Sequence, residues 1–261
     1  MALVAAEFLG TALLVTVGVS VVILAFGAGS PVAAVLPSPA WRRLLTGFGF
    51  GSVGALIALS PLGRISGAHV NPAVTAAFWL KGAMAGPLAV AYVLAQLVGA
   101  VVGALPLRFW GPLGASVRFG ATVPGASVAP AAAVAGEALT TAALLLGLFL
   151  FVGHRRLRPF TPLLFPFLYA AMVFLEAPIS GTSTNPARSL GPAVVAGAWH
   201  DWWVYWLGPA LGTALGAGAH ALTRLRRFEV DVAKLYHFAH DPHGVLRVAR
   251  REGGWDAHRS G

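Results

Sequence analysis

The chain has 261 residues, of which 57% are hydrophobic and only 10% charged, and its formal net charge is +9. A soluble domain carries about 25% charged residues, so this composition excludes an ordinary soluble protein and predicts a membrane domain. The lack of cysteine excludes a disulfide framework and a thiolate metal site. The basic residues lie at segment ends and near the C-terminus, which favours loops beside anionic lipid over nucleic-acid binding.

Six apolar segments are long enough to cross a bilayer, because a helical crossing needs about 20 residues. They are 5–26, 44–62, 83–105, 134–152, 161–178 and 202–222. We expect no cleavable signal peptide, since no charged segment or small-residue cleavage site precedes the first of them. Stretches rich in Gly and Pro at 29–39 and 108–130 predict surface loops. Residues 71–80 and 185–197 are apolar but too short to cross.

The predicted domain organisation is therefore one membrane domain over residues 1–223, followed by a tail over 224–261. The tail is polar and charged, without a convincing core, and we expect it to be soluble. Its three histidines at 237, 240 and 243 do not have a metal-ligand spacing.

Each short apolar segment follows the same motif. Ser-Gly, three residues and Asn-Pro-Ala occur at residues 66–73 and again 114 positions later, at 180–187. A single Asn-Pro-Ala predicts only a helix start, because Asn favours the N-cap and Pro the first helical position. Two copies in one register indicate a duplicated unit. The six motif residues are Asn71, Pro72, Ala73, Asn185, Pro186 and Ala187.

Other positions repeat with the motif, such as Glu7 with Glu137 and Tyr92 with Tyr205. Repeat one then covers about 1–105 and repeat two about 131–223, with three crossings each. Because three is odd, the second half enters the membrane from the other side, which predicts an inverted repeat. Each short segment covers roughly 14 Å of a core of about 30 Å, so the two are expected to meet end to end. The predicted fold is an all-α membrane protein with six transmembrane helices and two half-helices.

With these motifs, residues 7–222 resemble the aquaporins, or major intrinsic proteins, and bacterial water channels in particular. Members of this family are membrane channels for water and small neutral solutes. The resemblance implies a homotetramer in a lipid bilayer, with no cofactor and no metal. The two helix N-termini would meet at the midplane and oppose cations and protons. The amides of Asn71 and Asn185 are expected to be free to donate to a passing oxygen.

The resemblance also implies an outer constriction of four side chains. Arg188 directly follows the second motif, and spacing assigns Thr182 and Val173 to two further positions. The fourth is Phe50, or Gly51 if residues are counted straight back from the first motif. Because only Arg188 adds positive charge there, we do not expect anion conduction.

The leading hypothesis is a passive water channel that excludes protons and ions. Strict water channels in the family usually carry His at the position of Val173, so weak permeation of a small solute is also expected. Ser189, Ala193 and the pair Tyr205-Trp206 resemble the water subgroup. The alternative is a facilitator of glycerol, urea or a metalloid hydroxide.

Two further classes are disfavoured. A secondary transporter would need more intramembrane acids than Glu7 and Glu137, which the resemblance assigns to supporting the motif loops. An enzyme would need a nucleophile beside a base, and none stands near the motifs. The basic loop at 154–158 and the positive-inside rule place both termini in the cytoplasm. We therefore expect a multi-pass protein of the cell (inner) membrane.

Overall fold

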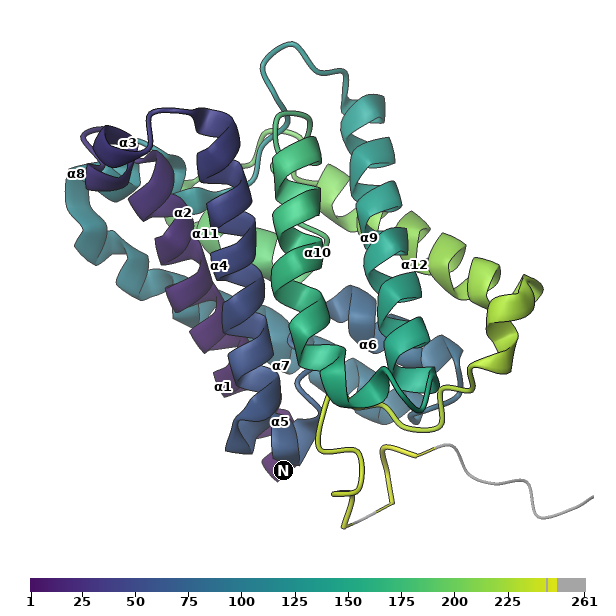
Figure 1. The fold of residues 1–261 in the computed structure, drawn as a ribbon. Coiled ribbons are helices and arrows are strands. Elements are labelled where there is room, and N and C mark those ends of the chain that lie inside the picture. The colour runs from purple at the N-terminus through teal and green to yellow at the C-terminus, as the bar shows by residue number, and fades with distance from the viewer. Residues whose placement is uncertain (243, 248–261) are drawn as a thin grey trace, which may run out of the picture.

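The structure is a computed structural model that describes residues 1–242 and 244–247, so His243 and the last part of the expected tail lie outside it. Over the described residues the protein is helical, which confirms the predicted fold class, and its only β-type pairing is an isolated antiparallel bridge between Val232 and Arg247. The long helices form a bundle, and Met1 and the tail lie at the same end of it (Figure 1).

Six long helical stretches build this bundle in the described chain. They are Ala2–Phe26, which consists of α1 (Ala2–Leu13), a π-helical turn (Leu14–Gly18) and α2 (Val19–Phe26), and then α4 (Pro39–Leu59), α7 (Gly86–Ala104), α9 (Pro130–Gly153), α10 (Thr161–Glu176) and α12 (Val204–Leu222). Four described segments are both long and apolar enough to cross a membrane: Ala2–Phe26, Gly86–Ala115, Pro130–Gly153 and Arg158–Glu176. The remaining two long helices pack along members of this set, α4 along α10 and α12 along α9.

Two short helices begin at the repeated motifs. Asn71 is the N-cap of α6 (Pro72–Leu80) and Asn185 is the N-cap of α11 (Pro186–Ala196), with Pro in the first helical position of each. The side-chain oxygen of each Asn accepts a hydrogen bond from the backbone of the first turn, as an N-cap does. The sequence motif therefore forms the local structure that its residue types favour.

The connections contain more helix than the predicted loops. The region 29–39 includes α3 (Pro31–Val35), and α4 begins at Pro39, five residues before the predicted crossing, because Pro suits the first turn of a helix. The other short helical segments are α5 (Pro61–Ser66), α8 (Gly111–Ala115), and 3₁₀ turns at Leu105–Trp110, Arg118–Gly120, Arg158–Phe160 and Arg224–Arg227.

Glycines on α4 bring its backbone against α10. A Cβ atom at Gly47 would lie 2.3 Å from the carbonyl oxygen of Tyr169, and one at Gly51 would lie 2.3 Å from that of Phe165. Small residues permit such close helix approach in membrane proteins. Gly51 therefore lies in the contact between α4 and α10, while the ring of its neighbour Phe50 packs against Gly18.

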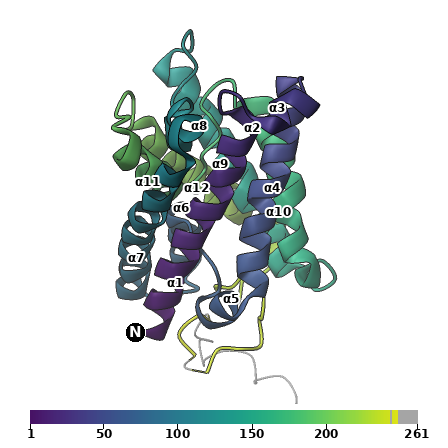
Figure 2. The same ribbon diagram turned by 90° about the vertical axis from the view of Figure 1, so that its left-hand side faces the viewer.

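The chain after α12 turns back under the bundle. Five of its hydrophobic side chains are buried, and they extend the core: Val230, Val232, Ala233, Leu235 and Leu246. Figure 2 shows this segment beneath α5 and close to Met1. We call this end of the bundle the terminal face, and the end that carries α3 the opposite face. The packing differs from the solvated tail expected from the sequence, because the few apolar residues there are spaced to meet the bundle.

Candidate functional site

The two motif loops have the same unusual backbone. Gly67 and Gly181 have φ of +93° and +91°, and two non-glycine residues in each loop are also left-handed. These are Ala68 and Val70 in the first loop, and Thr182 and Thr184 in the second. Such conformations cost on the order of 1–3 kcal/mol per residue and persist only where the surroundings hold them. The loops therefore need strong support from neighbouring groups.

Two carboxylates provide hydrogen-bond acceptors beneath these loops. Glu7 of α1 is fully buried and accepts hydrogen bonds from the Ser66 hydroxyl, from the backbone N–H groups of His69 and Val70, and from the Gln96 side chain, at 2.6–3.0 Å. Both oxygens are used. A carboxylate with this many donors is satisfied without a counter-ion at hydrogen-bonding distance.

Glu137 of α9 occupies the equivalent place under the second loop. It is fully buried and accepts hydrogen bonds from the Ser180 hydroxyl at 2.6 Å and from the backbone N–H groups of Ser183 and Thr184 at 2.7 Å. The hydroxyls of Tyr92 and Tyr205 complete the parallel, since they donate to the carbonyl oxygens of Ser66 and Ser180. The geometry is that of a support for each loop rather than a pair of carboxylates sharing a proton.

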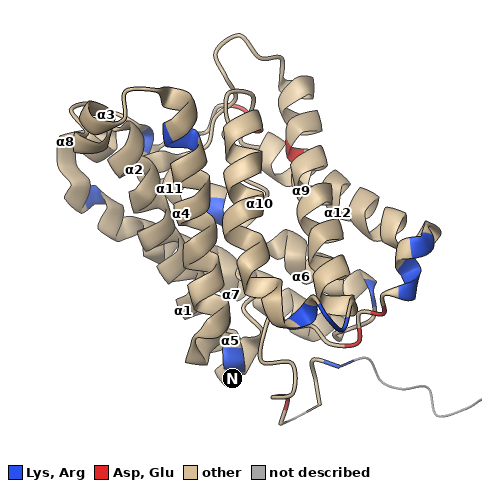
Figure 3. Ribbon diagram, in the orientation of Figure 1, with Lys and Arg blue, Asp and Glu red and all other residues tan. Residues whose placement is uncertain are grey.

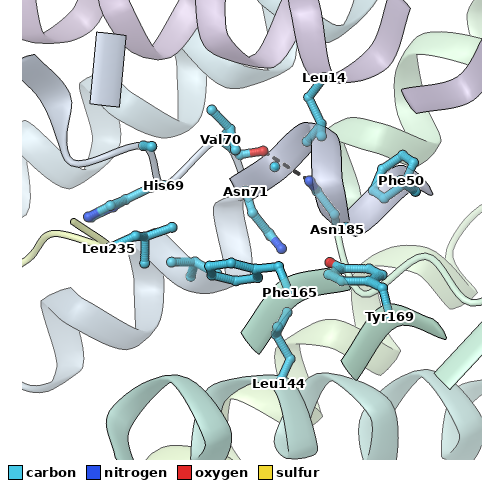
Figure 4. Close-up of a pocket in the computed structure, with 14 residues that line it drawn as sticks. Leu14, Phe50, His69, Val70, Asn71, Leu144, Phe165, Tyr169, Asn185 and Leu235 are labelled. Atoms are coloured by element: carbon cyan, nitrogen blue, oxygen red, sulfur yellow. Dashed lines mark hydrogen bonds between the residues drawn. The ribbon is translucent and has the colours of Figure 1, made fainter. Parts of the chain in front are cut away.

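The two motif asparagines bind the opposite loop. Asn71 donates from Nδ2 to the carbonyl oxygen of Thr184 at 3.0 Å, and Asn185 donates to that of Val70 at 2.9 Å. Figure 4 shows the second of these bonds, between Asn185 and Val70. Each amide was expected to be free, but one of its two hydrogens is committed to this contact, which leaves one hydrogen per amide. The N-termini of α6 and α11 consequently face each other.

A cavity of about 330 Å³ opens towards the opposite face. Its wall includes all four side chains predicted for the constriction, which are Phe50, Val173, Thr182 and Arg188. The alternative, Gly51, lines a different cavity. Arg188 is only 5% exposed, donates to the carbonyl oxygen of Gly120 at 2.8 Å, and has its guanidinium carbon 5.7 Å from the Phe50 ring centroid.

We call this cavity the outer cavity. Three residues near it were not predicted from the sequence, namely Arg43, Glu176 and Tyr169. Arg43 lines the cavity and donates to the carbonyl oxygen of Phe174, so Arg188 is not its only positive charge. The hydroxyl of Thr182 donates to Glu176, which directs this hydrogen away from a solute. Tyr169 lies one helical turn before Val173, and that spacing is the signal that could have identified it.

A second cavity of about 40 Å³ lies towards the terminal face. Both motif asparagines line it, together with His69, Phe165 and Leu235. Figure 4 shows His69 and Leu235 at one end of this inner cavity, and Phe50 and Tyr169 at the other. Phe50 and Tyr169 also line the outer cavity, so the two cavities adjoin at this pair. The two helix N-termini, capped by the motif asparagines, therefore lie at the inner cavity, and the outer cavity adjoins it.

Comparisons with known proteins agree with this geometry. The family profile described as "Major intrinsic protein" matches residues 1–220. The chain is 38% identical to human "Aquaporin-2" over 220 residues, which are 81% of this chain and 74% of that protein. It is 35% identical to "Aquaporin-8" of Rattus norvegicus over 212 residues, or 78% of this chain and 74% of the relative.

A solved structure has the same fold. It is described as the X-ray structure of the aquaglyceroporin from Plasmodium falciparum, and it matches with a TM-score of 0.72 at 20% identity, over 88% of this chain and 98% of that one. Together with the family match over residues 1–220, the duplicated loops and the adjoining cavities lead to one assignment. The chain belongs to the major intrinsic protein family, whose members are passive membrane channels and not enzymes.

Proposed function

We propose that this protein is a passive channel for water that excludes protons and ions. The observation that carries the proposal is the reciprocal contact of Asn71 and Asn185, which holds two helix N-termini face to face at the inner cavity. Each N-terminus carries a partial positive charge of about half an electron. A cation or a proton on a water chain meets this field from either side, whereas a neutral molecule does not.

Water would be oriented at this point by its oxygen. Each asparagine amide has one hydrogen left after its contact with the opposite loop, and it would donate this hydrogen to the passing molecule. No covalent step is involved, so the site works by orientation and exclusion alone. Glu7 and Glu137 would keep the loops in the strained backbone that presents both amides to one path.

The outer constriction would select among neutral solutes. Phe50 and Val173 supply an apolar wall, and Arg188 supplies the donors, since a guanidinium has five N–H groups and Gly120 uses only part of this set. The Thr182 hydroxyl is bound to Glu176, so the constriction offers few donors to a polyol. This scarcity favours water over glycerol.

The second candidate function is a facilitator of glycerol, urea or a metalloid hydroxide. The observation in its favour is Val173, which leaves more width and no imidazole donor at the constriction. Water and these solutes differ in the number of hydrogen bonds that they require, so we expect fast water flow with weak permeation of a small solute.

The deciding experiment is stopped-flow light scattering of proteoliposomes under sucrose, glycerol and urea gradients. We expect water flow well above that of protein-free vesicles, with slow but detectable solute entry. Glycerol entry as fast as in a dedicated glycerol channel would instead establish the second candidate. Steady ionic current through the native protein in planar bilayers would contradict both.

We also infer six crossings, with the terminal face in the cytoplasm. Basic residues gather mainly at the ends of the long helices (Figure 3), and the loop at 154–158 shares the terminal face with Met1. The chain has no cysteine, so Pro37→Cys and Arg155→Cys each introduce a single thiol at an exposed position. An impermeant maleimide should label them from opposite sides of the membrane. Labelling of both from one side would contradict this topology.

The same proposal includes a homotetramer with one pore per subunit in the cell (inner) membrane. Its support is the family resemblance and the many apolar side chains exposed on the bundle, which lipid or other subunits would cover. Native mass spectrometry from a mild detergent should give four times the 26.9 kDa of one chain. A monomer under all conditions would argue against it.

A further inference from the structure

The chain's own tail contributes to the wall of the inner cavity at the terminal face. Leu235 lines this cavity and is buried, although it lies 164 positions after Asn71 in the chain. In Figure 4 its side chain lies beside His69, at the end of the cavity away from Phe50. The cavity holds about 40 Å³ with Leu235 in place, against about 330 Å³ for the open outer cavity.

The tail is bound directly to the first motif loop. The backbone N–H of Leu235 donates to the carbonyl oxygen of Gly67 at 3.0 Å. His69 Nε2 lies 2.9 Å from the carbonyl oxygen of Ala233, and its Nδ1 lies 3.1 Å from the Thr75 hydroxyl. These contacts are satisfied when Nε2 carries the proton and donates it to the tail. The loop that forms the pore thus also forms the binding surface for the tail.

Lys234 fixes the tail beside these contacts. The residue is 0% exposed, and its Nζ donates to the carbonyl oxygen of Arg64 at 2.7 Å and to that of His240 at 2.6 Å. Arg64 lies in the last turn of α5, where carbonyl groups lack a partner within the helix and attract a cation. A buried ammonium needs such partners, so this site specifies one position of the tail.

The tail is also a small folded unit that is joined to α12 by an exposed connection. Ala233 donates its N–H to the carbonyl oxygen of Leu246 at 2.7 Å, and Asp241 accepts from the Leu246 N–H at 3.1 Å. The link to the bundle at Leu222–Arg227 is mostly exposed, with Leu222 at 89%. The exposed connection allows the unit to move relative to α12, and its further contacts with the bundle include those of Asp231 with Arg158 and of His237 with the carbonyl oxygen of Leu59.

From these contacts we infer that the described part of the tail, residues 230–242 and 244–247, acts as a plug that closes the pore at the terminal face, and that solute flow requires the plug to leave. The inference rests on the proposed channel function. It adds a gate to that function, formed by Leu235 in the inner cavity and held by backbone contacts to Gly67 and by Lys234.

The first test weakens the plug in the full-length protein. Leu235→Ala removes the side chain that fills the cavity, and Lys234→Ala removes two buried hydrogen bonds. Loss of a buried leucine side chain should weaken docking by roughly thirtyfold or more. Leu222→Ala is the matched control, because it removes the same atoms from an exposed position beside the tail. Stopped-flow water permeability per protomer should rise several-fold in the first two variants and stay unchanged in the control.

A second pair of variants uses the symmetry of the two loops. Gly67 and Gly181 have the same left-handed backbone, so replacing either by Ala imposes a similar strain. Only at Gly67 would the new Cβ lie 2.6 Å from the carbonyl oxygen of Ala233 in the plug; at Gly181 the closest atom is 3.4 Å away. Gly67→Ala should therefore conduct water faster than Gly181→Ala, since both carry the strain but only one displaces the plug.

Hydrogen–deuterium exchange of the tail separates the possible outcomes. The amides of Ala233 and Leu235 should exchange slowly in the native protein and quickly in Leu235→Ala and Lys234→Ala. Fast exchange in the native protein would overturn the docked plug. Fast exchange in the variants with native water flow would overturn the gate while leaving the channel function intact. Released tails without any flow of water, glycerol or urea would overturn the proposed function, and the gate with it.

Discussion

The two motif loops are close copies in structure, yet they face different surroundings. Each is left-handed at equivalent positions, each rests on a buried glutamate, and each binds the other's asparagine. The second loop, however, faces a cavity of about 330 Å³, while the first faces one of about 40 Å³ that is lined in part by Leu235 of the tail. The duplication preserved the support of the backbone and left the side chains around it free to differ.

Two equivalent positions account for much of that difference. Arg188 has Val74 as its counterpart 114 residues earlier, so a cation lines the outer cavity where an apolar side chain lines the inner one. Ser183 has His69 as its counterpart; the serine bonds within its own loop, whereas the histidine reaches Ala233 of the tail. The outer and inner cavities thus differ through side chains on a common backbone frame.

The largest expected effect comes from removing the shared supports. Glu7→Ala removes the carboxylate acceptor of four buried donors and Glu137→Ala that of three, at about 1–3 kcal/mol for each group left unsatisfied. We expect both variants to lose most of their folded protein, with the larger loss at Glu7. Fluorescence-detected size exclusion measures the monodisperse fraction.

The exposed Glu229→Ala is the control for this comparison, because its side chain lies on the surface of the tail. Native yield and water flow in either glutamate variant would show that the loops do not depend on their carboxylates.

The next prediction makes the second loop more like the first. Arg188→Val places at this position the residue type found at its counterpart, Val74, and removes the buried cation of the outer cavity. Glycerol and urea permeability should rise by about an order of magnitude, and proton leak should become measurable, because the constriction widens and loses its positive charge. Solute-gradient light scattering and a pH-sensitive dye in the vesicle lumen report the two effects.

Arg43→Val is the matched control, since Arg43 lines the same cavity but donates to Phe174 on its wall. A similar rise in both variants would assign the exclusion to net positive charge in the cavity and not to the position of Arg188.

The features that occur in both halves of the chain could be predicted from the sequence. The helix caps at Asn71 and Asn185 follow from local residue preferences, and the location of Glu7 and Glu137 under the loops agrees with their matched registers. These features recur at one spacing and depend on local structure. Arg188, Thr182 and Val173 likewise follow from their distance to the second motif, and the structure brings them to one cavity.

The features that were not predicted occur once and depend on tertiary contacts. Arg43 meets Phe174 across 131 positions, and Lys234 meets Arg64 across 170. Neither contact has a counterpart in the other half, so no spacing in the sequence indicated it. The tail was expected to be solvated for the same reason: its apolar residues are too few to form a core without the bundle.

A smaller effect is expected at Val173. Val173→His adds bulk and a donor to the constriction, so glycerol and urea entry should fall several-fold while water flow changes by less than about twofold. The comparison of water and solute flow in the same vesicles removes differences in reconstitution. Unchanged solute flow would mean that the side chain at 173 does not limit passage.

The smallest predicted effect is a pH dependence of the plug. Burial lowers the pKa of Lys234 from 10.5 to about 8, against the attraction of Asp241 and with the repulsion of Arg247 and Arg64. A released tail keeps its proton up to the higher pKa, so docking releases a proton between the two values and becomes more favourable as the pH rises. Docking should therefore strengthen as the pH rises from 7 to 9.

Water flow through the native protein should accordingly be slower at pH 9 than at pH 7. The groups that face Lys234 are Arg64 of α5, His69 of the first loop, and His240, Asp241 and Arg247 of the tail. Lys234→Ala isolates the contribution of Lys234 from theirs. If the variant retains the native pH dependence, another of these groups is responsible.

The crossed asparagine bonds have a consequence for how the protein is made. The carbonyl partner of Asn71 at Thr184 is 113 residues further along the chain. A ribosome that adds about 5–20 residues per second needs roughly 6–23 s to supply it. Glu7 can form its hydrogen bonds sooner, because its most distant partner in the sequence, Gln96, belongs to the first half. The first motif loop is therefore supported by Glu7 before its contacts with the second loop can form. Both asparagine bonds between the loops form only when the second half arrives.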